Sequence, residues 1–131
     1  MRSLDAPRER PAPRRYSATS LDGEILEGEF TSLCLVLAVK GDCMGCRSVF
    51  DAAADAFGNV AVLIVARTDS REPWWDESVH PVVISPTLLD DLAVRWPPFY
   101  VLVDPVAQRV VSEGVVFAPA QVREEIAPFL V

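Results

Sequence analysis

The sequence predicts an α/β fold in which a mixed central β-sheet is flanked by helices. Residues 33–39 and 60–66 form two almost wholly apolar runs, and the segment between them has apolar residues at helical spacing. A strand, a helix and a strand in that order form a crossover unit, which makes the two strands parallel. Residues 99–103 and 109–115 predict an additional antiparallel pair, joined by a turn at Asp104-Pro105. The continuous apolar runs indicate that both faces of the sheet are covered.

A β-hairpin is expected as an N-terminal extension of this sheet. Short extended pieces between Tyr16 and Phe30 lie on either side of Asp22-Gly23, and Asp-Gly is a typical hairpin turn. Before the hairpin, residues 1–14 are rich in Arg and Pro and poor in apolar side chains, which predicts a disordered basic tail. We therefore expect one domain, at residues 15–131.

The composition excludes several kinds of protein. Half of the 131 residues are hydrophobic, which is enough for a core that needs no cross-links. The formal net charge is −7, and residues 16–131 carry 17 acidic against 7 basic side chains. Such an acidic body argues against nucleic acid as a partner. Three cysteines are too few for the disulfide framework of a small secreted protein.

The same sequence gives an expectation about location. No apolar run reaches the length of a transmembrane helix, and the N-terminal residues lack the apolar stretch of a secretory signal. We expect no transmembrane span, and a cytoplasmic protein for the chain as written. An exported or membrane-anchored form is expected instead if an N-terminal segment has been removed.

The segment with the clearest chemistry is Cys43-Met44-Gly45-Cys46, at the junction between the first apolar strand and the helix after it. A C-x-x-C at such a junction is typical of a redox-active dithiol. The reason is that the thiolate is the attacking form, and backbone N–H groups at a helix N-terminus stabilise that anion. Cys43 lies where this stabilisation is available.

The apolar face of the helix that follows predicts different roles for the two cysteines. Cys46 shares its apolar face with Val49, Phe50, Ala53 and Phe57, so its sulfur is expected to face inward. Cys43 is then the exposed, attacking sulfur, and Cys46 is the resolving one. Gly58-Asn59 is expected to end this helix.

The third cysteine, Cys34, lies inside the first apolar strand and is expected to be a buried, inert thiol. A zinc site formed by Cys34, Cys43, Cys46 and His80 is an alternative to a dithiol, but structural zinc usually uses two close pairs of ligands and only one is present. We expect no metal. His80 is the only histidine and is expected to be a surface or loop-packing residue rather than a catalytic base.

Three further helices are expected. Asp69 or Ser70 can cap a short helix that runs through Trp74, Trp75 and Val79. The paired tryptophans there either face a partner or cover the sheet, and both possibilities remain open.

The second of these helices starts at Ser85-Pro86 and stops at Trp96-Pro97-Pro98, and the third opens at Pro119 with Val122 and Ile126 facing inward. The expected buried stripe of the second helix consists of Leu88, Leu89, Leu92 and Trp96.

Three segments together resemble thioredoxin-like proteins, and among them the TlpA-like branch of thiol–disulfide oxidoreductases. They are Leu21-Asp22-Gly23-Glu24 before the first central strand, the C-x-x-C itself, and Pro98-Phe99-Tyr100-Val101-Leu102-Val103-Asp104. The resemblance covers residues 15–131 and implies the thioredoxin-like fold. It also implies that the peptide bond before Pro98 is cis and that Pro98 lies beside the dithiol.

The resemblance further implies substrate binding by Pro98, Pro97, Met44 and Gly45. A proline at position 98 has no N–H group, so the backbone beside it can pair with a substrate chain without leaving a donor unpaired. Three positions depart from the family pattern. Asp42 replaces a Trp, Gly45 replaces a Pro, and Leu37 stands where thioredoxins have a buried acid.

These observations predict a thiol–disulfide oxidoreductase that works without a bound cofactor, the dithiol itself being the redox group. Its expected partners are a protein or small-molecule disulfide or dithiol substrate and an upstream thiol reductant or oxidant. The alternative is a thioredoxin-fold binding module that docks a partner through Trp74 and Trp75 and has little redox turnover.

Overall fold

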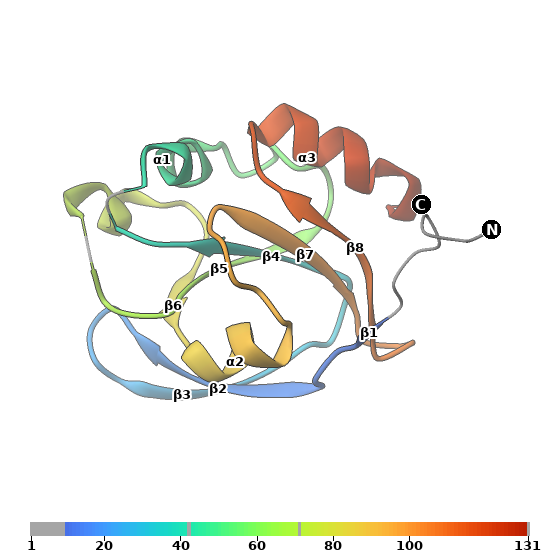
Figure 1. Cartoon of the computed structure of the whole chain (residues 1–131), viewed down its shortest axis with the longest axis horizontal. Helices are drawn as coiled ribbons and strands as arrows, with labels where there is room; N and C mark the ends of the chain where they lie inside the picture. The colour runs from blue at the N-terminus through green and yellow to red at the C-terminus, as the bar shows by residue number, and fades with distance from the viewer. Residues whose placement is uncertain (1–9, 42, 71, 131) are drawn as a thin grey trace.

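A computed structural model of the chain describes residues 10–41, 43–70 and 72–130 (Figure 1). Its centre is one eight-stranded mixed sheet with the strand order β1-β8-β7-β4-β5-β6-β2-β3. The strands are β1 (Arg10–Pro11), β2 (Arg15–Ser20), β3 (Ile25–Glu29), β4 (Cys34–Val39), β5 (Ala61–Ala66), β6 (Val82–Ile84), β7 (Phe99–Asp104) and β8 (Arg109–Val115). The helices are α1 (Met44–Asp51), α2 (Pro86–Asp91) and α3 (Pro119–Ile126), with 3-10 turns η1 (Pro73–Glu77) and η2 (Ala127–Phe129).

Strand β4 lies in the middle of the sheet. It pairs in parallel with β5 and antiparallel with β7, and all six of its residues are buried. Because successive side chains of a strand point to opposite faces, β4 contributes to two cores. Cys34, Val36 and Ala38 join the core under α2, whereas Leu35, Leu37 and Val39 join the core under α1 and α3. Figure 1 shows α1 and α3 on one side of the sheet and α2 on the other.

These features confirm the α/β class, the parallel β4–β5 pair and the antiparallel β7–β8 pair. The N-terminal hairpin is also present as β2 and β3, and it joins the sheet through pairing of β2 with β6. Gly23 adopts a φ of 89° in its turn, a backbone conformation that glycine accepts without strain. None of the described helices is long and apolar enough to span a membrane.

The prediction that residues 1–14 are disordered is wrong for residues 10–14, and residues 1–9 lie outside the described part of the chain. Arg10 and Pro11 pair with β8, the Arg10 guanidinium forms an ion pair with Glu113, and Ala12 is buried. The Arg10 side chain also donates to the Leu92 carbonyl. These partners are about 80 to 100 residues away in sequence, so local composition could not indicate them.

Helix α1 is shorter than expected. It ends at Asp51, because Ala52 has an extended backbone with φ −65° and ψ 140°. Residues 54–57 form turns, and Phe57 reaches the core from there rather than from a helical turn. Gly58 does adopt a left-handed φ of 94°, but in a turn rather than as a helix cap.

Two other helix predictions need correction. Residues 73–77 form a 3-10 turn without a side-chain cap, and the Ser70 hydroxyl instead accepts the Gly41 N–H at 2.9 Å. Helix α2 begins with Ser85 as its predicted N-cap but ends at Asp91, since Ala93 has a φ of 58° and turns the chain away. Trp96 is therefore not part of the buried stripe: it is 74% exposed, whereas Leu88, Leu89 and Leu92 are buried.

Candidate active site

The dithiol lies between the C-terminal end of β4 and the first turn of α1. Cys43 is the N-cap of α1, with an extended backbone at φ −113° and ψ 104°, and its Sγ accepts a hydrogen bond from the Cys46 N–H at 3.1 Å. A sulfur that accepts from a first-turn N–H is held at the positive end of the helix, which favours its thiolate when the pair is reduced. In the structure Cys43 and Cys46 form a disulfide, with their Cα atoms 5.2 Å apart.

The two sulfurs differ in access to solvent. Cys46 is 1% exposed and belongs to the core under α1, together with Val49 and Phe50. Cys43 is only partly buried and packs at the margin of this core. The inward orientation of Cys46 and the more exposed position of Cys43 are thus as predicted.

Pro98 lies against the dithiol turn. The peptide bond between Pro97 and Pro98 is cis. A Cβ atom added to Gly45 would come within 3.3 Å of the Pro98 Cγ, so the proline ring covers the turn between the two cysteines. The Pro98 carbonyl accepts the Val116 N–H at 3.0 Å, which ties this segment to the end of β8.

The other expected substrate-binding residues are placed as follows. Gly45 is exposed and contacts Pro98, and Pro97 is half-buried next to a surface cavity. Met44 lies in the first turn of α1, but its side chain is outside what the structure describes. Asp42 is also outside the described residues. A binding role for any of these residues stays a prediction.

Leu37 departs from the family pattern where thioredoxins have a buried acid, and its environment is apolar. It is fully buried in the core that contains Cys46 and lies opposite Tyr100 on β7. The Tyr100 hydroxyl donates to Glu125 at 2.8 Å and lies 2.9 Å from the Ser112 hydroxyl. Burial raises the pKa of Tyr100 to about 12, so this hydroxyl stays protonated near neutral pH.

Cys34 is at the far end of β4 from the dithiol and points into the opposite core. It is 7% exposed, is a free thiol, and belongs to the core under α2. Burial raises the pKa of its thiol to about 12. Five residue steps of a strand separate it from Val39, about 17 Å at the usual rise, so it is too far away to take part in exchange at Cys43.

The structure does not bring together the four residues considered for zinc. Cys34 lies on the other face of the sheet from Cys46. His80 is buried beside Phe57, with 6.0 Å between the ring centroids, and burial lowers its pKa. Of the two alternatives expected for His80, this packing fits the loop-packing residue. Within residues 10–41, 43–70 and 72–130, no group of three or more metal-ligating side chains is arranged to hold an ion.

The three tryptophans differ in their burial. Trp75 is 1% exposed and stacks on Phe50 under α1, with 5.3 Å between the ring centroids. Trp74 is half-buried beneath the Arg47 guanidinium, which lies 4.7 Å from its ring centroid. Of the alternatives left open for this pair, Trp75 covers the sheet. The most exposed tryptophan is Trp96, two residues before Pro98.

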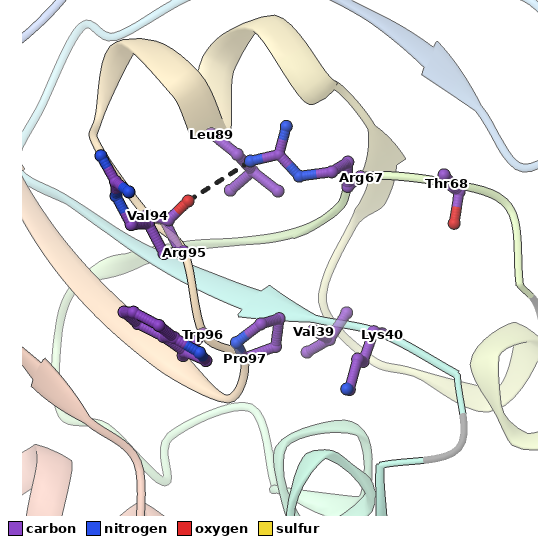
Figure 2. Close-up of a pocket in the computed structure, with 9 residues that line it drawn as sticks. All are labelled: Val39, Lys40, Arg67, Thr68, Leu89, Val94, Arg95, Trp96 and Pro97. Carbon is purple, nitrogen blue, oxygen red and sulfur yellow. Dashed lines mark hydrogen bonds between the residues drawn. The ribbon is translucent and has the colours of Figure 1, made fainter.

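Sequence reasoning missed a cavity beside Trp96. It has a volume of about 270 Å³ and is lined by residues that include Lys40, Arg67, Arg95, Trp96 and Pro97 (Figure 2). These residues come from the ends of β4 and β5 and from the segment before β7. The sequence contains no local signal for the cavity, because three separate segments form it.

The sheet order, the C-x-x-C at the N-terminus of the helix after the central strand, and the proline packed against that turn are together typical of a dithiol protein with the thioredoxin-like fold. Solved structures with this fold are similar along almost the whole chain. The thioredoxin domain of a thiol-disulfide oxidoreductase from Bacteroides vulgatus has a TM-score of 0.67 at 19% identity, with 93% of this chain and 96% of that chain covered.

Two further solved structures give the same result. A thio-disulfide isomerase from Thermus thermophilus has a TM-score of 0.68 at 14% identity and covers 92% of this chain and 94% of its own. MTB dsbF has a TM-score of 0.65 at 21% identity and covers 89% and 98%. Neither a family model nor a curated protein sequence matches the chain. The likeness confirms the thioredoxin-like fold, and the TlpA-like branch stays a prediction.

Proposed function

We propose that this protein is a thiol–disulfide oxidoreductase in which Cys43 attacks and Cys46 resolves. The observation that carries the proposal is the asymmetry of the pair. Cys43 is partly exposed and its sulfur accepts a helix N–H, whereas Cys46 is bonded to it from inside the core. The similar solved structures include thiol-disulfide oxidoreductases, which supports the same class.

The proposed reaction is a pair of exchanges. The Cys43 thiolate attacks one sulfur of a substrate disulfide, forms a mixed disulfide, and releases the other substrate sulfur as a thiolate that takes up a proton. Cys46, after losing its proton, then attacks the Cys43 sulfur and releases the second substrate thiol. The substrate gains two electrons and the protein loses two, which leaves the Cys43–Cys46 disulfide. The reverse sequence oxidises a substrate dithiol.

Several parts of the chain assist this reaction in the proposal. Pro98, which packs on Gly45, and the neighbouring Pro97 hold the substrate backbone next to Cys43. No bound cofactor takes part, because the dithiol carries the electrons. The substrates are disulfides or dithiols of proteins or small molecules, and an external thiol reductant or oxidant resets the pair.

Reduction of insulin disulfides by dithiothreitol tests the proposal. The wild-type protein should accelerate insulin precipitation, and Cys43→Ser should lower the rate to that of the reaction without protein, because no attacking thiolate remains. Cys34→Ala is the matched control and should keep the wild-type rate. A wild-type rate equal to the reaction without protein would reject an oxidoreductase function.

The binding-module alternative has less support. Docking through Trp74 and Trp75 requires both rings to be accessible, but Trp75 is buried against Phe50 and Trp74 is partly covered by Arg47. We therefore do not propose docking through this pair.

A further inference from the structure

The cavity beside Trp96 is unusual for its charge. Residues 16–131 contain 7 basic side chains against 17 acidic ones, and three of the basic ones, Lys40, Arg67 and Arg95, line this single cavity. No acidic side chain among the described residues lines it. A small region of positive charge is thus built into a protein of net charge −7.

Two of these three cations have no ion-pair partner in the described part of the chain. Lys40 is exposed and Arg95 is exposed, and neither forms a salt bridge with a described carboxylate. Arg67 is different, because it donates to Asp90 at 2.7 Å and to the Val94 carbonyl at 3.3 Å. The charge of Arg67 is therefore already paired with a carboxylate of the protein, whereas Lys40 and Arg95 remain able to bind an anion.

On its Trp96-Pro97 side, the cavity lies next to the segment that packs on the dithiol turn. Figure 2 shows Trp96, Pro97 and Lys40 along the side nearer α1, with Arg67 across the cavity from them. Pro97 precedes Pro98, whose ring packs on Gly45 between the two cysteines. A chain bound at Cys43 and following Pro98 and Pro97 would therefore reach the cavity within a few residues.

Trp96 gives this region an apolar contact surface as well as charge. Its indole is 74% exposed, and exposed tryptophans are enriched in sites that bind protein chains. A second cavity, of about 470 Å³, shares Trp96 and Arg95 with the first and is also lined by Arg10 and Glu113, which form an ion pair with each other. Arg10 and Glu113 compensate each other there, so the unpaired cations near Trp96 are Arg95, which the two cavities share, and Lys40, which lines the first.

We propose that the cavity lined by Lys40, Arg67, Arg95 and Trp96 binds acidic residues that flank the reacting cysteine of a protein substrate. This inference rests on the proposed function, and it adds a substrate class: peptide segments rich in Asp and Glu. Carboxylates of the segment pair with Lys40 and Arg95, and its apolar atoms lie on the Trp96 ring. Opposite charge also speeds the encounter of such a segment with the protein.

Binding can be measured without any exchange chemistry. Two eight-residue peptides are compared that differ only in having four Glu or four Gln residues, with Ser in place of the reacting Cys. The indole N–H signal of Trp96 is followed by NMR and assigned through Trp96→Phe. We expect the Glu peptide to shift this signal at concentrations about tenfold lower than the Gln peptide at low salt, and the difference to shrink as salt screens the charges.

Variants of the protein separate the cavity from general charge. Lys40→Gln combined with Arg95→Gln should remove the preference for the Glu peptide. Arg123→Gln, an exposed substitution on α3 outside the cavity, should keep it. Equal affinity for the two peptides, or an undiminished preference in the double variant, would overturn the proposal.

A second measurement separates this proposal from the proposed function. The same peptides with Cys, carried as mixed disulfides with 2-mercaptoethanol, are mixed with the reduced protein, and neutral 2-hydroxyethyl disulfide serves as the reference. A faster reaction with the Glu peptide supports the proposal. Equal peptide rates, with normal reaction of the reference, overturn the acidic preference and leave the oxidoreductase function standing. Failure to react with any of the three contradicts the oxidoreductase function, and the binding data still decide whether the cavity takes acidic peptides.

Discussion

Cys43 and Cys34 lie near opposite ends of strand β4, and their surroundings differ in burial and in how readily each thiol loses its proton. Cys43 lies just beyond the C-terminal end of the strand, is partly exposed, and accepts a helix N–H. Cys34 begins the strand, is buried in the apolar core under α2, and has a pKa raised to about 12. The same side chain is therefore placed for nucleophilic attack at one end and kept protonated at the other.

The largest expected effect concerns the partner of Cys43. Cys46→Ser should accumulate a covalent mixed disulfide between Cys43 and a substrate, because no resolving thiol remains to release it. Incubation of the reduced variant with a disulfide substrate, followed by non-reducing electrophoresis and mass spectrometry, measures the adduct. The wild type and Cys34→Ser should form almost none. An equal amount of adduct in wild type and Cys46→Ser would contradict the resolving role.

The next effect is on stability at the other end of the strand. Cys34→Ser should lower the free energy of unfolding by roughly 1–3 kcal/mol, because it places a hydroxyl in a largely apolar core. Cys34→Ala, which adds no polar group, is the matched control and should cost less. Urea unfolding of both variants measures the difference. A Ser variant as stable as the wild type would mean that the site is more polar than the structure indicates.

A smaller effect is expected from alkaline pH. The thiol of Cys34 titrates near 9 when unperturbed and at about 12 in the folded protein. Between these values the unfolded chain has lost the proton and the folded protein keeps it, so stability falls as pH rises from 9 towards 12. Tyr100, raised from 10.0 to about 12, acts in the same direction.

The contribution of Cys34 can be isolated in a Cys43→Ser/Cys46→Ser background, which prevents disulfide exchange at high pH. Urea unfolding at pH 8 and pH 10 should show a larger loss of stability when Cys34 is present than in the matching Cys34→Ala protein. The same loss in both proteins would show that Cys34 does not titrate differently on folding.

The sequence was most informative where local patterns and burial agree. The apolar composition of β4 and β5 and the spacing of Cys43 and Cys46 at a helix start predicted the sheet centre and the orientation of both sulfurs. The resemblance to thioredoxin-like proteins added the place of Pro98, which no helical or strand period indicates.

Predictions failed where a distant contact or a single backbone angle decides the structure. Helical spacing predicted that α2 continues to Trp96. The left-handed backbone of Ala93 turns the chain away from the helix, and the Trp96 indole is exposed. The order of residues 10–14 depends on contacts of Arg10 with Leu92 and Glu113. The cavity of Lys40, Arg67 and Arg95 likewise exists only once β4, β5 and the segment before β7 are packed together.

The most direct test of the contrast between Cys43 and Cys34 is alkylation of the reduced protein near neutral pH with a bulky thiol reagent, followed by peptide mass mapping at increasing times. The more exposed Cys43, whose thiolate the helix N-terminus stabilises, should be labelled first. Cys46 should follow slowly, and Cys34 should react only after unfolding in urea. First labelling of Cys46 or Cys34 in the folded protein would contradict the assigned roles of the three sulfurs.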